Sequence, residues 1–185
     1  LDQGHRRIAF LSGDSLHVSS VYERHQGYLE ACLGRNCYDP TLERWFPKAL
    51  EAKPDHLGTA TRDALYFLLG QPEPATALFC TQDIYAAAAS EALDSIAAER
   101  SSICLITYND WPGAVLPRAS EFARIIQPMQ EVGRRAVELL SRRLESPQSP
   151  WHHVRLQSQF LPPNRQASTP GTALQTNEGN HYERT

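Results

Sequence analysis

The sequence has no run of about eighteen apolar residues, the length that a membrane-spanning helix needs. Its first residues, from Leu1 to Arg7, lack the apolar core of a secretory signal peptide. The chain does not begin with methionine, so we interpret it as a piece of a longer protein, in which a missing export signal says little. These features argue against a membrane protein.

The sequence also lacks an excess of positive charge. Its 18 lysines and arginines face 21 aspartates and glutamates, which gives a net charge of −3. Proteins that grip the phosphates of DNA carry a basic patch or stripe. We therefore do not expect this piece of chain to bind DNA by itself.

The four cysteines do not form a Cys-x-x-Cys pair. Cys80 and Cys104 lie inside apolar runs and are predicted to be small core residues. Cys32 and Cys37 are close enough in sequence to bridge in an oxidising compartment. We expect reduced thiols instead, as in a cytosolic protein.

Catalytic and metal-binding motifs are missing too. There is no Gly-x-Ser-x-Gly, no phosphate-binding loop and no Gly-x-Gly-x-x-Gly. His152 and His153 are adjacent, so on a strand they point to opposite faces. Asp14, Asp83 and Asp110 follow predicted strands, but their spacing does not require a metal ion. We predict that the chain is not an enzyme and uses no metal and no cofactor.

What the sequence does contain is an alternation of strand and helix patterns. Short apolar runs predict buried strands at 8–11, 76–81, 103–108 and 123–126. Helical patterns begin at a capping box of Ser20 and Glu23, and then cover 59–69, 83–97 and 130–144. The alternating segment 154–161 predicts a half-exposed edge strand, whereas the proline-punctuated stretch 34–54 predicts no regular element.

This alternation predicts an α/β domain with a parallel sheet and helices on both faces. The chain has 185 residues, of which 41% are apolar, enough for one ordinary core. Ligands of such folds bind outside the carboxyl ends of the strands. Polar residues gather at all four predicted ends: Ser12 to Asp14, Gln82 with Asp83, Asn109 with Asp110, and Gln127.

Five segments, in this order, carry a resemblance to a known family. They are Gly4 to Gly13, Arg24-x-x-Gly27-Tyr28, Pro74 to Asp83, Tyr108-Asn109-Asp110, and Ile126-Gln127-Pro128 followed by Glu131-x-Gly133-Arg134-Arg135-Ala136. Each segment is weak alone. Together they resemble the effector-binding core of the lac-repressor-like (LacI/GalR) family of bacterial transcription regulators.

The resemblance implies a fold and a domain organisation. It implies the periplasmic-binding-protein-like type I fold, mainly the C-terminal lobe, over residues 1–165. Residues 126–146 correspond to the strand and helix that return to the N-terminal lobe. The polar tail 166–185 is expected to be disordered. Most of the first lobe and the DNA-binding headpiece are then absent from this chain, so the apolar stripe of the 130–144 helix is expected to be exposed.

The function implied is that of a cytoplasmic regulator, expected to be a repressor. A small polar effector such as a sugar would bind between the lobes and change the affinity for operator DNA, which the absent headpiece would contact. The chain would form a homodimer and contact no membrane. An exported solute-binding protein of a sugar transporter has the same fold and is the alternative. The coding sequence upstream separates the two, by a helix-turn-helix or a signal peptide.

The resemblance also assigns ligand-binding residues. Arg24 falls on the family's ligand-contacting arginine, whose fork of donors suits paired hydroxyls; the alternative is an exposed helix arginine. Asn109 falls on the family's sugar-contacting carboxylate but carries no charge, and it could equally be a loop residue that bonds its own backbone. Gln127 enters with the strand that crosses between the lobes, where its alternative is a hinge residue.

Four further residues are candidates with strong structural alternatives. Gln82 stands where the family has asparagine, so it would shrink the cleft or reach a smaller ligand. Asp83 is better explained as the N-cap of the following helix, and Ser20 by its capping box. Trp111 could stack on a sugar ring or cover the core. Because two polar contacts differ from the family's pattern, the effector itself does not carry over.

Overall fold

The computed structural model describes residues 1–96, 103–108 and 122–163. They form one six-stranded sheet in the order β2-β1-β3-β4-β5-β6, in which β6 alone is antiparallel to its neighbour. The strands are β1 Ile8–Gly13, β2 Glu43–Phe46, β3 Ala77–Cys80, β4 Cys104–Tyr108, β5 Ala123–Ile126 and β6 Gln159–Leu161. The α-helices are α1 Ser19–Leu33, α2 Pro54–Leu69, α3 Asp83–Ser95 and α4 Met129–Glu145, with short 3-10 turns at Pro40–Leu42 and Lys48–Leu50.

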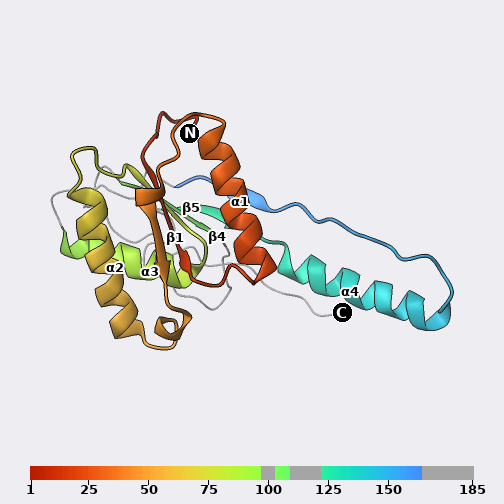
Figure 1. Ribbon diagram of the computed structural model, residues 1–185. Helices are drawn as coiled ribbons and strands as arrows, with labels where there is room; N and C mark the ends of the chain where they lie inside the picture. The colour runs from red at the N-terminus through yellow and green to blue at the C-terminus, as the bar shows by residue number, and fades with distance from the viewer. Residues whose placement is uncertain (97–102, 109–121, 164–185) are drawn as a thin grey trace, which may run out of the picture.

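The helices lie on both faces of the sheet, as the sequence predicted (Figure 1). Successive side chains of a strand point to opposite faces, and β1 divides its residues accordingly. Ala9 and Leu11 pack in the cluster that contains α2 and α3, whereas Phe10 packs with Tyr28 and Cys32 of α1. The connection from β1 to β2 and the connection from β2 to β3 cross the sheet in opposite directions. Because such connections are right-handed, they place α1 and α2 on opposite faces of the sheet.

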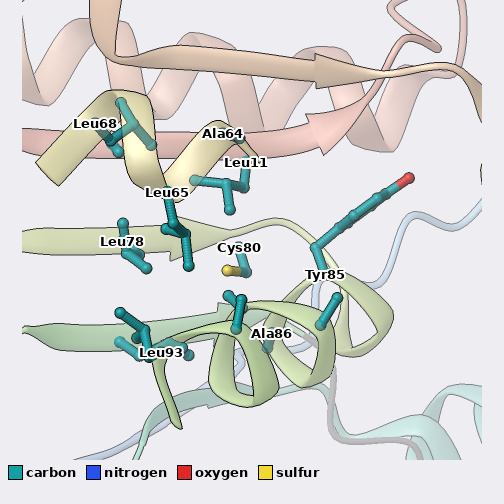
Figure 2. Packing of buried hydrophobic residues seen from close by; sticks show 14 of the residues in the cluster. Leu11, Ala64, Leu65, Leu68, Leu78, Cys80, Tyr85, Ala86 and Leu93 are labelled. Carbon is teal, nitrogen blue, oxygen red and sulfur yellow. The ribbon is translucent and has the colours of Figure 1, made fainter. Parts of the chain in front are cut away.

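The larger cluster supplies most of the core (Figure 2). Leu65 and Leu68 of α2, Leu78 of β3 and Tyr85 of α3 are fully buried between the two helices and the sheet. Burying a leucine side chain stabilises a fold by roughly 1.5–3 kcal/mol. This packing holds the carboxyl ends of β1 and β3 in fixed positions.

Several predicted element boundaries differ from the structure, and three of the differences concern how an element begins or how long it is. No capping box forms at Ser20, because a turn from Ser15 to Val18 starts the helix earlier: Val18 is the N-cap, and its carbonyl accepts the N–H groups of Val21 and Tyr22. Helix α2 begins at Pro54 rather than at 59, since proline at the first helical position needs no hydrogen bond. The edge strand β6 is shorter than the predicted 154–161.

One strand was missed altogether. Strand β2 lies at the sheet edge inside the stretch for which the sequence predicted no regular element. It has four residues, two of them charged, which is typical of a short edge strand. Glu43 connects this edge to α1 through a partly buried contact with His25, whose Nε2 lies 2.9 Å from the Glu43 Oε1 atom.

Helix α4 projects away from the sheet, and none of its residues is buried (Figure 1). Its apolar side chains are exposed, with Leu140 at 59% and Leu144 at 73% of their full exposure. This agrees with the expectation that the rest of the chain does not cover its stripe. Among the described residues, no helix combines the length and the hydropathy required to cross a bilayer.

Candidate functional site

A groove of about 470 Å³ runs between α1 and the neighbouring face of the sheet. Its walls come from α1, from β3 and β4, and from the end of β5. The groove is mostly apolar along the sheet, where Phe79, Ile106 and Ile125 line it. Its polar end lies at the carboxyl ends of the strands, where Arg24, Tyr108 and Gln127 meet.

Arg24 is the charged centre of this polar end. Its Nη1 atom donates a hydrogen bond of 2.8 Å to the carbonyl oxygen of Thr81, the residue after β3. The guanidinium carbon lies 4.1 Å from the centre of the Tyr108 ring, in a cation–π contact. Two independent contacts therefore fix the orientation of the guanidinium before any ligand arrives.

Burial and neighbouring groups have opposite effects on the pKa of Arg24. Burial lowers the pKa of Arg24, because the charged form loses water. Tyr108 and, to a smaller extent, the carboxylate of Asp83 counteract that decrease. An arginine remains charged under these conditions, so the groove presents a positive donor group at its polar end.

Gln127 and Tyr108 link the ends of β5 and β4. The Gln127 Nε2 atom lies 3.4 Å from the Tyr108 hydroxyl, which is a long hydrogen bond. Gln127 is separated from α4 by Pro128 alone. The Gln127 side chain, at the polar end of the groove, is thus close in sequence to the helix that projects away from the sheet (Figure 1).

A second, buried set of polar groups lies beneath this end. The Thr81 hydroxyl donates to the Ser12 hydroxyl at 2.8 Å, which joins the ends of β3 and β1. The Thr107 hydroxyl donates to the Asp83 carboxylate at 3.1 Å. Because all four residues are buried, these bonds satisfy groups that would otherwise destabilise the fold. They fix the backbone around Thr81, whose carbonyl oxygen accepts the hydrogen bond that orients Arg24.

The prediction that Asp83 is an N-cap was wrong. The N-cap of α3 is Gln82, which makes no side-chain capping bond, and Asp83 is the first helical residue. Its carboxylate turns inward to Thr107, since that hydroxyl needs an acceptor in the core. A carboxylate in the first turn still interacts favourably with the positive end of the helix dipole.

The structure brings three of the seven predicted site residues together. Ser20, Arg24 and Gln127 line the same groove. Gln82 and Asp83 are not among its lining residues, although Asp83 acts electrostatically on Arg24. Asn109 and Trp111 lie outside the described residues. The absence of a capping box removes the structural explanation for Ser20 and leaves its position in the groove as the relevant one.

Sequence reasoning did not single out Tyr108, although it contacts both Arg24 and Gln127. A signal was present, because Tyr108 is the last residue of a strand and bears a hydroxyl at the edge of the sheet where ligands of such folds bind. Within the described part of the chain, no group of three or more histidine, cysteine, aspartate or glutamate residues could hold a metal ion.

Comparison with known proteins gives one family match. Residues 1–162 match the family described as the periplasmic binding protein-like domain. No curated protein matches the chain.

Solved structures with this fold are numerous. The chain is similar to the transcriptional regulator CelR in complex with cellobiose, at 25% identity and a TM-score of 0.67, over 86% of this chain and 46% of that one. It is also similar to a regulatory protein of the LacI family from Chloroflexus aggregans, at 23% identity and a TM-score of 0.69, over 86% of this chain and 54% of that one. A LacI family transcriptional regulator from Mycobacterium smegmatis has 23% identity and a TM-score of 0.59, over 77% of this chain and 50% of that one. The chain thus spans about half the length of these structures.

Proposed function

We propose that this chain, which belongs to the periplasmic binding protein-like domain family, is the effector-sensing part of a bacterial DNA-binding transcription regulator. Structures of similar fold include LacI-family regulators. Another structure of similar fold is the transcriptional regulator CelR in complex with cellobiose, which supports a sugar or a related polar metabolite as the effector here. In the full-length protein, a separate headpiece would contact the operator, and the protein would act as a cytoplasmic repressor.

The observation that carries this proposal is the convergence of Ser20, Arg24 and Gln127 on one groove. Ser20 and Arg24 belong to α1, whereas Gln127 follows β5 about a hundred positions later, yet all three line the same groove. Arg24 presents a fixed fork of donors, Ser20 a hydroxyl, and Gln127 both a donor and an acceptor. This set suits a small, uncharged molecule with several hydroxyl groups.

The same geometry suggests how binding could reach the operator. An effector that bonds to Gln127 stabilises one position of the chain immediately before Pro128 and α4. Any effector that prefers one arrangement of the lobes shifts the population toward it. The regulator would then bind operator DNA with a different affinity when the effector is present.

A thermal-shift screen of the full-length protein tests the proposal, with cellobiose, other sugars and purines as probes. A ligand that binds only the native state raises the melting temperature as its concentration increases. We expect at least one uncharged sugar to do so in the wild type and to lose its effect in Arg24→Ala. If every stabilising ligand acts equally on wild type and variant, the groove is not the effector site.

The coding sequence upstream of Leu1 provides a separate test. A helix-turn-helix would support a regulator, because the proposal requires a DNA-binding headpiece in the full-length protein. A signal peptide would instead identify an exported solute-binding protein of a transporter, which shares this fold and would use the same groove.

A further inference from the structure

The end of α1 places two cysteines against each other. Asn36 has a φ of 51°, in the left-handed region that asparagine tolerates better than most residues. The N–H of Cys37 donates to the Cys32 carbonyl at 3.0 Å, and the N–H of Asn36 to the Leu33 carbonyl at 3.1 Å. These two bonds define a Schellman motif, in which the first and last residues of the six-residue turn, here Cys32 and Cys37, come close together.

An apolar contact between these two positions frequently accompanies the motif, but here both positions are cysteine. Cys32 is 2% exposed and lies in the small cluster with Phe10 and Tyr28, against which Cys37 packs. The Cys37 thiol donates a hydrogen bond of 3.5 Å to the Cys32 carbonyl oxygen, which keeps its sulfur beside that residue. Both are free thiols in the structure.

We propose that Cys32 and Cys37 are a reversible modification site, which closes to an intramolecular disulfide when a small disulfide such as oxidised glutathione is present. The hydrogen bonds of the motif already hold the two residues at the ends of a six-residue loop, so closure needs side-chain rotation rather than refolding. The site borders the groove, because Cys32 is one of its lining residues.

The reaction proceeds in two exchanges. The thiolate of Cys37, the more accessible of the two, attacks one sulfur of oxidised glutathione, which forms a mixed disulfide and releases one glutathione thiolate. The thiolate of Cys32 then attacks the Cys37 sulfur and releases the second glutathione. Two cysteine S–H bonds become one S–S bond, and the two protons and two electrons leave with the two molecules of reduced glutathione.

The second exchange is expected to be the slow one. Burial, together with the neighbouring Cys37, raises the pKa of Cys32 to about 11. Only a small fraction of Cys32 is therefore thiolate at neutral pH. The rate of ring closure should rise about tenfold for each unit of pH between 7 and 9, because it follows the thiolate fraction.

Peptide mapping of the folded chain tests the proposal. After incubation with oxidised glutathione, remaining thiols are alkylated and the unreduced protein is digested with trypsin. Arg35 lies between the two cysteines, so cleavage there separates residues 25–35 from 36–44. We expect these two peptides to remain joined, to separate on reduction, and to form faster at pH 9 than at pH 7.

Variants separate the motif from chance proximity. Asn36→Gly keeps the left-handed conformation and should close as the wild type does, whereas Asn36→Val disfavours it and should close more slowly. Cys104→Ser is the control with an unrelated thiol removed, and it should retain the bridge. A mixed disulfide that persists on Cys37 at pH 9, or a bridge that joins either residue to Cys80 or Cys104, would overturn the proposal.

Discussion

Arg24 is the residue on which the candidate site depends most, because its contacts with the Thr81 carbonyl and the Tyr108 ring leave it little freedom to rearrange. A preorganised charged donor binds a hydroxyl group without first paying for its own ordering. The same contacts mean that removal of the side chain should affect both binding and the local packing of the groove.

We predict that Arg24→Ala weakens effector binding in the full-length protein by about 1.5–3 kcal/mol, the usual loss for hydrogen bonds to a charged group. Isothermal titration calorimetry measures this directly. Arg62→Ala is the matched control, because Arg62 is exposed on α2 and does not line the groove. An unchanged affinity in Arg24→Ala would remove this residue from the site.

At the scale of single residues, the sequence predicted some positions in the groove but not all of their contacts. Arg24 and Gln127 were predicted because they lie in segments that resemble the family, and the structure places both in the wall of the groove. Asp83 was assigned to a cap because a carboxylate at a helix start commonly has that role. The structure instead pairs it with Thr107, a partner 24 residues away. No local pattern reveals a contact that depends on the pairing of β3 with β4.

Helix α2 contains the clearest imperfection among the elements of the core. Thr61 is fully buried, and its hydroxyl has no hydrogen-bond partner among the residues that the structure describes. A buried hydroxyl without a partner destabilises a protein by roughly 1–3 kcal/mol. Valine has the same shape and lacks the polar group.

We therefore expect Thr61→Val to increase the free energy of unfolding by about 1 kcal/mol. Thr61→Ala is the informative comparison, because it removes the hydroxyl but also leaves a cavity, and it should not stabilise the chain. Urea unfolding followed by circular dichroism measures both. Equal stability of the wild type and Thr61→Val would show that the hydroxyl finds a partner in solution.

Element prediction succeeded where the pattern was long or apolar. The apolar runs gave β1, β3, β4 and β5, and β5 was found at its observed limits, Ala123–Ile126. Strand β2 was not predicted because Glu43 and Arg44 break the apolar pattern. It forms through pairing with β1. Its formation depends on a neighbour distant in sequence, which single-sequence patterns do not contain.

At the scale of the whole molecule, the described residues form a sheet packed against helices, from which α4 projects without a buried residue. The exposed side chains of α4 include Val132, Val137, Leu140 and Leu144. Removal of apolar surface from water contributes roughly 25 cal/mol per Å², so a stripe of this kind favours association.

We predict that the 185-residue chain associates in a concentration-dependent way, most simply as a two-fold dimer that covers α4. Light scattering over a range of concentrations measures this. Leu140→Glu should shift the equilibrium toward the monomer, whereas Ser141→Glu adds the same charge at the next position and should not. A wild-type monomer at high concentration, with amides of α4 protected from hydrogen exchange, would contradict the prediction.

The central claim is that this groove senses an effector on behalf of a DNA-binding headpiece. Titration of the full-length protein into labelled DNA from upstream of its gene, with and without the sugar found in the thermal-shift screen, tests it most directly. We predict that the sugar changes the affinity for DNA, that DNA changes the affinity for the sugar by the same factor, and that the 185-residue chain alone binds no specific site. Tight and specific DNA binding by this chain, or a DNA affinity that the bound sugar leaves unchanged, would contradict the account.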